Sequence, residues 1–148
     1  MSERKHADRL RFAQTLAQRS PDPSTKVGAV LYSSFNVSVG LGWNSFPSNM
    51  NVDSSYYTNR ELKYDRIIHA EMRALLQAGD HANGGLVYTS LVPCKHCAKH
   101  ICDTGVNKVY IPASCMTSDW VKRFSAEVHI SMQLFAECDV QVIEVEGV

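Results

Sequence analysis

Apolar side chains recur at helical spacing near the start of the chain. Among the charged residues of segment 4–19, the apolar positions are Leu10, Phe12, Ala13, Leu16 and Ala17. Intervals of three and four residues place side chains on one face of a helix, so this pattern predicts an amphipathic helix over residues 4–19. The helix ends in segment 20–23, which contains two prolines that a helix cannot pass through.

The pattern then changes to short apolar runs. Residues 26–32 and 37–43 are rich in valine and are separated by only four residues, so they predict a β-hairpin. Residues 44–64 are polar and show no period. A structureless segment of this length in a small domain is usually functional or disordered, and we expect such a loop here.

Helical spacing returns over residues 65–78 and stops near Gly79. After a turn at residues 83–85, the sequence predicts a strand over 86–91, a helix over 94–104 and a strand over 108–111. Two strands joined through a helix pair in parallel, so these elements predict a βαβ unit.

The last part of the pattern predicts one or two helices within residues 117–137 and a final strand over 140–145. No repeat or linker divides the chain. We therefore expect one α/β domain over residues 1–148, built around a sheet of about five strands with the hairpin at one end.

Composition supports a globular domain and argues against some partners. Hydrophobic residues make up 45% of the 148 residues and charged residues 20%, which is ordinary for such a domain. The chain has 15 basic and 15 acidic residues, and this balance argues against a nucleic-acid partner, because nucleic-acid binders usually carry a basic surplus. The polar start and the lack of an apolar run of about 18 residues predict a cytoplasmic protein with no membrane partner.

Five cysteines are present, two of them in a Cys-x-x-Cys pair. Without an export signal, we interpret this set as metal ligands plus free thiols. The cysteines outside the pair are Cys102, Cys115 and Cys138, and we expect them to be buried or inert.

The segments most informative about chemistry are His69-Ala70-Glu71 and, further on, Pro93-Cys94-Lys95-His96-Cys97. His69, Cys94 and Cys97 are good zinc ligands, and three protein ligands leave one tetrahedral position open for water, as in catalytic zinc sites. The pattern H-x-E followed by P-C-x-x-C is typical of zinc-dependent nucleobase deaminases, where the glutamate moves protons and does not bind zinc.

The predicted helices support this interpretation. Cys94 and Cys97 lie three residues apart at a helix start, where the helix dipole favours thiolates, and His69 falls near the first turn of the preceding helix. One neutral histidine and two thiolates give a neutral zinc centre, which acidifies water less than three histidines would and makes a nearby proton acceptor valuable. Glu71, at i+2 from His69, points about 200° around a regular helix, so we expect it to reach the open position only from a frayed helix start.

Other interpretations of these residues exist. A Cys-x-x-C pair alone also occurs in redox sites and structural zinc sites, but the upstream His-x-Glu and the lack of a second pair favour catalytic zinc. His96 and His100, four residues apart, suggest a second metal, but no third ligand is apparent and a solvated helix face fits better. A zinc-stabilised interaction module without turnover would need the zinc ligands but not Glu71.

Beyond the zinc residues, segments 22–30, 43–47, 63–71 and 89–94 resemble the deoxycytidylate (dCMP) deaminase family, and the resemblance runs over roughly residues 5–112. It implies a three-layer α/β/α cytidine-deaminase-like fold with a mixed sheet. It also implies hydrolysis of dCMP to dUMP and ammonia by a zinc-activated water, with dUMP supplied to thymidylate synthesis. The resemblance assigns zinc to His69, Cys94 and Cys97, the proton shuttle to Glu71, the sugar contact to Asn44 and a pyrimidine contact to the backbone of Ala70.

Many members of that family are hexamers regulated by dCTP and dTTP, so the resemblance implies a homo-oligomer with these effectors. Two positions depart from the family pattern: Ser45 stands where glycine is usual, in the loop used for regulation, and Arg73 replaces an asparagine. For the substrate phosphate, which needs cationic or amide donors, candidates in the right neighbourhood are Ser24, Thr25, Lys26, Arg60 and Lys63.

The alternatives within enzymes are a tRNA adenosine deaminase, which has the same zinc motif, and another free nucleoside or base deaminase. The neutral charge and the long interval between Asn44 and His69 argue against tRNA. Asn44 itself is also compatible with an ordinary turn asparagine.

Overall fold

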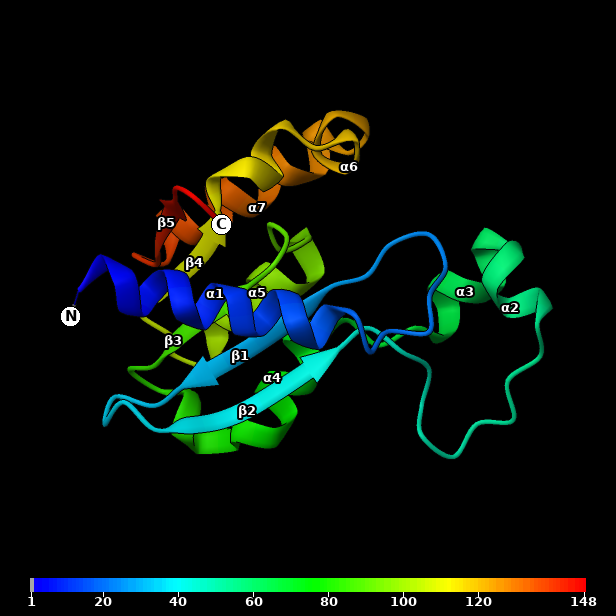
Figure 1. Cartoon of the computed structure of the whole chain (residues 1–148), viewed down its shortest axis with the longest axis horizontal. Coiled ribbons are helices and arrows are strands. Elements are labelled where there is room, and N and C mark those ends of the chain that lie inside the picture. Colours follow the sequence, from blue (N-terminus) through cyan, green and yellow to red (C-terminus); the bar gives the residue numbers. More distant parts are fainter. Residues whose placement is uncertain (1) are drawn as a thin grey trace.

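A computed structural model describes residues 2–148, in which five strands form one sheet of order β2-β1-β3-β4-β5 (Figure 1). β1 runs antiparallel to both β2 and β3, whereas β3, β4 and β5 are parallel. The predicted hairpin, βαβ unit and mixed five-stranded sheet are thus confirmed. The strands are β1 (Gly28–Tyr32), β2 (Ser38–Trp43), β3 (Leu86–Thr89), β4 (Lys108–Pro112) and β5 (Gln141–Val145).

Helices cover both faces of the sheet, which gives the expected three layers. Leu10, Ala13 and Leu16 of α1 pack on one face against Val30 and the tyrosines of β3 and β4. Residues of α4, α5 and α7 pack on the other face. The helices are α1 (Glu3–Ala17), α2 (Ser55–Thr58), α3 (Arg60–Arg66), α4 (Ala70–Ala78), α5 (Lys95–Asp103), α6 (Asp119–Arg123) and α7 (Ser125–Glu137), with 3₁₀ turns at Gly79–Ala82 and Ala113–Thr117.

Glycine in β2 allows α4 to lie directly on the strand. A Cβ atom built on Gly40 would be 2.1 Å from the backbone oxygen of Ala74, and one on Gly42 would be 2.9 Å from that of Ala70. Only a residue without a side chain tolerates such an approach of helix and strand backbones. The position of α4 matters because its first turn carries part of the candidate site.

Segment 44–64 differs from its prediction as a structureless loop. It contains α2 and most of α3, and these two short helices are set apart from the sheet (Figure 1). Asn59 begins α3, since its Oδ1 accepts the backbone N–H of Leu62 at 3.2 Å. Helices of four and seven residues are too short to show a full apolar period, which is why the pattern did not reveal them.

The helix predicted over residues 65–78 begins later than expected: residues 65 and 66 are the end of α3, and a break separates them from α4. Ser45 and Ile68 exchange both backbone hydrogen bonds, at 3.1 and 2.8 Å, and this isolated bridge holds the chain extended after α3. The second helix, α4, therefore begins only at Ala70. Among residues 2–148, no helix combines the length and the apolar character needed to cross a membrane.

Candidate active site

Two helix starts meet at the predicted metal ligands. His69 is the residue that immediately precedes α4, and Cys94 immediately precedes α5. Nδ1 of His69 lies 3.3 Å from Sγ of Cys94 and 3.4 Å from Sγ of Cys97. The sequence prediction that two helix N-termini present these three residues to one point is therefore confirmed.

These donor atoms fit a zinc ion. All three lie within 4.8 Å of one another, and within residues 2–148 this is the one group of three or more such residues placed to hold a metal. Zn–S bonds of about 2.3 Å and Zn–N bonds of about 2.1 Å at a tetrahedral angle separate N and S by about 3.6 Å, close to the distances found. Two thiols and an imidazole are also the soft and borderline donors that zinc prefers.

Hydrogen bonding prepares the two thiols differently. Donation from Cys97, together with the neighbouring His69, lowers the pKa of Cys94 well below its ordinary value and so favours its thiolate form. The same contact raises the pKa of Cys97, and burial raises it further. The Cys94 thiolate in turn raises the pKa of His69 to about 9. A metal cation bound to His69, Cys94 and Cys97 would take the place of the protons that these three side chains share.

Glu71 lies in the first turn of α4, with only 4% of its surface exposed. Burial raises the pKa of its carboxyl to about 7. Because His69 precedes α4 in extended conformation, with φ −70° and ψ 153°, the separation of about 200° that a regular helix imposes does not apply. His69 and Glu71 can therefore face the same cavity.

A cavity of about 280 Å³ opens onto these residues. His69, Ala70, Glu71 and Cys94 line it on one side, and its other walls come from segments far apart in the sequence. Residues of this second group that sequence reasoning did not single out include Tyr57, Trp120 and Arg123. Tyr57 belongs to α2 and the other two to α6, and no motif in the sequence marked α2 or α6 as part of the site.

Asn44 also lines the cavity, but most of its carboxamide serves the protein. Its Oδ1 accepts the backbone N–H of Val27 at 2.8 Å, and its Nδ2 donates to the backbone oxygen of Thr25 at 2.7 Å. One lone pair on Oδ1 remains for another donor. The side chain of Asn44 is thus buried and stabilises the loop before β1, and its Oδ1 can still accept one more hydrogen bond.

Of the five candidates for the phosphate contact, Ser24, Thr25, Arg60 and Lys63 line the cavity, and Lys26 does not. Ser24 lines the cavity, and its hydroxyl accepts a hydrogen bond from Lys63 at 3.0 Å. Lys26 is not among the lining residues, because its ammonium group donates to the backbone oxygen of Ser20. The cations that do line the cavity are Arg60, Lys63 and Arg123.

Comparison with known proteins agrees with this site. Residues 3–113 match the model of the cytidine and deoxycytidylate deaminase zinc-binding region. The chain belongs to this deaminase family. The matched range includes His69, Glu71, Cys94 and Cys97, so this deaminase is a hydrolase with a zinc-binding region, in which His69, Cys94 and Cys97 are placed to hold the metal ion.

Curated relatives of the deaminase cover different shares of their own length. An uncharacterized deaminase of Aliivibrio fischeri is 35% identical over 133 residues, which is 90% of this chain and 88% of the relative. Human deoxycytidylate deaminase is 34% identical over 99 residues, or 63% of this chain and 56% of that protein. The match thus spans about half the length of the human enzyme.

Among solved structures, the deaminase is similar to the dCMP deaminase of cyanophage S-TIM5 in complex with dCMP and dUMP. The TM-score is 0.74 with 23% identity, over 97% of this chain and 98% of the phage chain. This likeness confirms the cytidine-deaminase-like fold.

Proposed function

We propose that this deaminase hydrolyses dCMP to dUMP and ammonia, and so supplies dUMP for thymidylate synthesis. The observation that carries the proposal is one shared cavity, which Glu71 and the zinc ligands His69 and Cys94 line together with three cations. A cytosine ring needs the first group of residues and a phosphate dianion needs the second.

His69, Cys94 and Cys97 would hold a zinc ion, which would act as a Lewis acid and make the attacking water more acidic. The protein itself supplies proton transfer. Glu71 takes a proton from the attacking water and delivers it to the ring nitrogen. It then takes the second proton of that water, from the hydroxyl group now on the ring carbon, and passes it to the amine, which leaves as ammonia while the carbonyl forms. A buried carboxyl with a pKa of about 7 suits both directions of transfer near neutral pH.

Ala70 and Asn44 suit the two neutral parts of the substrate. Ala70 is the first residue of α4, and the first N–H groups of a helix have no partner within it, so its backbone is free to donate to the pyrimidine carbonyl. The remaining lone pair on Oδ1 of Asn44 accepts a sugar hydroxyl. We propose these contacts as the positioning of ring and sugar over Glu71.

The phosphate would bind among Arg60, Arg123 and Ser24. The charge of Lys63 is already paired with Asp22, at 2.7 Å, whereas neither arginine takes part in an ion pair among the described residues. Two unpaired guanidinium groups attract a dianion more strongly than a neutral nucleoside. Lys26 stays a prediction, with less support because its side chain lies outside the cavity lining.

The assembly proposed from the family resemblance is a homo-oligomer, a hexamer in many members, with dCTP and dTTP as effectors. Ser45 occupies the regulatory loop position where glycine is usual, so this chain tests whether that glycine is needed. Sedimentation with and without dCTP and dTTP, together with activity at subsaturating dCMP, measures both properties.

Ammonia release from a panel of substrates tests the proposed activity. The panel is dCMP, deoxycytidine, dCTP, CMP, cytosine and a tRNA anticodon stem. We expect dCMP to have the highest kcat/KM, since it alone combines deoxyribose with one phosphate. A preference for the tRNA stem would overturn the proposal in favour of a tRNA adenosine deaminase.

A further inference from the structure

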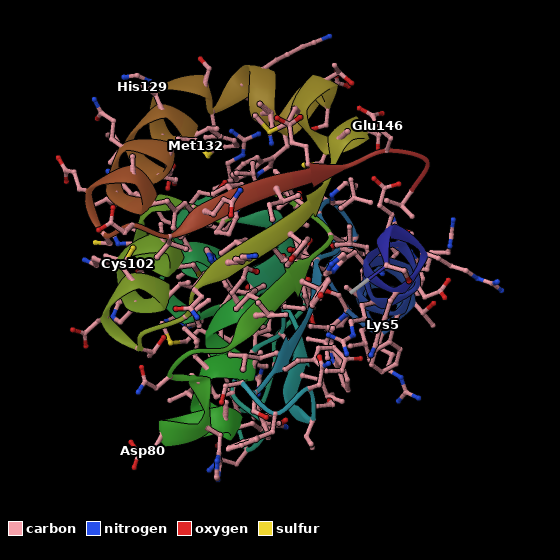
Figure 2. The ribbon with its side chains drawn as sticks, turned by 90° about the vertical axis from the view of Figure 1, so that its left-hand side faces the viewer. Lys5, Asp80, Cys102, His129, Met132 and Glu146 are labelled. Carbon is pink, nitrogen blue, oxygen red and sulfur yellow. The ribbon has the colours of Figure 1, made fainter. Side chains whose placement is uncertain are left out.

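Two cysteines outside the zinc site meet at the surface where α5 and α7 pack together. Cys102 lies in the last turn of α5, and Cys138 directly follows α7. Sγ of Cys102 is 3.7 Å from the backbone oxygen of Leu134, and the backbone N–H of Cys138 donates to that same oxygen at 3.1 Å. Figure 2 shows Cys102 on this face, beside α7.

The three remaining cysteines, which the sequence predicts to be buried or inert, differ in their exposure. Cys138 is exposed and Cys102 is partly exposed, whereas Cys115 is buried, with 7% of its surface accessible. Neither Cys102 nor Cys138 lines the active-site cavity. Both are free thiols, and a small oxidant in solution can reach this pair without entering the active site.

We propose that Cys102 and Cys138 form a reversible redox site, which a low-molecular-weight disulfide such as oxidised glutathione converts to an intramolecular disulfide. The Cys138 thiolate attacks one sulfur of oxidised glutathione, which forms a mixed disulfide and releases one glutathione thiolate. Cys102 loses its proton to solvent and attacks Cys138 Sγ, which expels the second glutathione as a thiolate. The two protein thiols are thus oxidised by two electrons, and one glutathione disulfide is reduced to two thiols.

The surroundings set the order of these steps. Burial raises the pKa of Cys102 to about 12, and the adjacent Cys138 thiol contributes to this rise. Cys138, which is exposed, is therefore the thiol that meets the oxidant. Once Cys138 is in a mixed disulfide, its thiol no longer raises the pKa of Cys102, so ring closure becomes easier.

The expected consequence is a covalent link between α5 and α7. The disulfide would join the ends of segment 102–138 and so restrict the unfolded chain. We expect a Tm higher by roughly 5–10 °C in the oxidised protein. Because α5 begins at the zinc ligands, the link would also fasten the far end of the helix that carries them.

Trypsin separates all five cysteines, which makes the test specific. Cleavage after lysine and arginine gives peptides 74–95, 96–99, 100–108, 109–122 and 124–148, each with one cysteine. Zinc-loaded protein is incubated with oxidised glutathione, remaining thiols are blocked, and the digest is analysed by mass spectrometry. We expect peptides 100–108 and 124–148 to be joined, while peptide 109–122, with buried Cys115, stays reduced.

Two variants separate the steps. Cys102→Ser should stop at a stable glutathione adduct on peptide 124–148, and Cys138→Ser should leave peptide 100–108 reduced. In both variants the rise in Tm on oxidation should be lost, while deamination by the reduced protein is unchanged. The proposal is overturned if wild-type protein does not react, accumulates only the adduct at Cys138, or joins peptides from the zinc site instead.

Discussion

The ammonium group of Lys63 lies 2.7 Å from a carboxylate oxygen of Asp22. Both side chains are nearly inaccessible, with 11% and 1% of their surfaces exposed. Lys63 belongs to α3 and Asp22 to the loop before β1, so the pair fastens the α2–α3 segment to the sheet at the cavity wall. A segment that is otherwise set apart from the domain is held by this contact.

Removal of one partner should be strongly destabilising. Lys63→Met leaves the carboxylate of Asp22 buried without its counter-charge, and breaking such pairs costs about 3–5 kcal/mol. We expect a loss of this size in the free energy of urea-induced unfolding. The double variant Asp22→Asn/Lys63→Met should recover much of it, and equal losses in the single and double variants would contradict a role for the ion pair.

The same pair predicts an acid-dependent loss of stability. Burial alone would raise the pKa of Asp22, but hydrogen bonds from Lys63 and Ser24 outweigh it and hold the pKa below its ordinary value of 3.8. A carboxyl with a depressed pKa stabilises the fold above its unfolded-state pKa, and this contribution disappears as pH falls from about 4 through the folded-state pKa.

The urea concentration at which half of the protein is unfolded, measured at several pH values between about pH 6 and pH 3, tests this prediction. The wild type should lose more stability on acidification than Asp22→Asn, which has no carboxyl to titrate at this position. Identical pH profiles for the two proteins would show that Asp22 does not contribute.

Close contact between β2 and α4 gives a third prediction. In Gly40→Ala the new methyl group would lie 2.1 Å from the backbone oxygen of Ala74, so α4 must move away from the sheet. We expect a loss of about 3 kcal/mol or more, measured by thermal or urea unfolding. Ser38→Ala, on the exposed end of the same strand, is the matched control and should change stability little. An unchanged Gly40→Ala protein would contradict the packing described.

The sequence predicted those parts of the fold in which local pattern and tertiary packing agree. The sequence pattern predicted α1 from its helical period and the β1–β2 hairpin from two apolar runs. It also predicted the βαβ unit from β3 to β4. The zinc ligands could be predicted because zinc binding requires specific residue types at fixed spacing. The same spacing predicted that the three ligands come together at the starts of two helices.

Other parts of the site depend on tertiary contacts that leave no local pattern. α2 and α3 are too short to show a period, and the break before α4 comes from the bridge between Ser45 and Ile68. Trp120 and Arg123 line the cavity from α6, which is more than 20 residues away from the zinc-ligand motifs in the sequence. The direction of Lys26 away from the cavity likewise depends on its contact with Ser20.

Arg123 should contribute to binding of the phosphate. Loss of one charge-assisted hydrogen bond costs about 1.5–3 kcal/mol, so Arg123→Ala should raise KM for dCMP by roughly 10–100-fold. KM for deoxycytidine, which lacks a phosphate, should change little. Lys122→Ala removes a neighbouring exposed cation that does not line the cavity and is the matched control. Equal effects of Arg123→Ala on both substrates would contradict a phosphate contact.

Replacement of Glu71 tests the central claim most directly. Zinc-loaded wild type and Glu71→Gln are compared for dUMP formation from dCMP, with the zinc content and Tm of each protein measured in parallel. Glutamine matches the neutral form of this buried carboxyl in shape but cannot accept the proton. We predict equal zinc content, similar Tm and a kcat lower by about 10²–10⁴-fold in the variant. Wild-type protein with full zinc that forms no dUMP, or a variant as active as the wild type, would contradict the account.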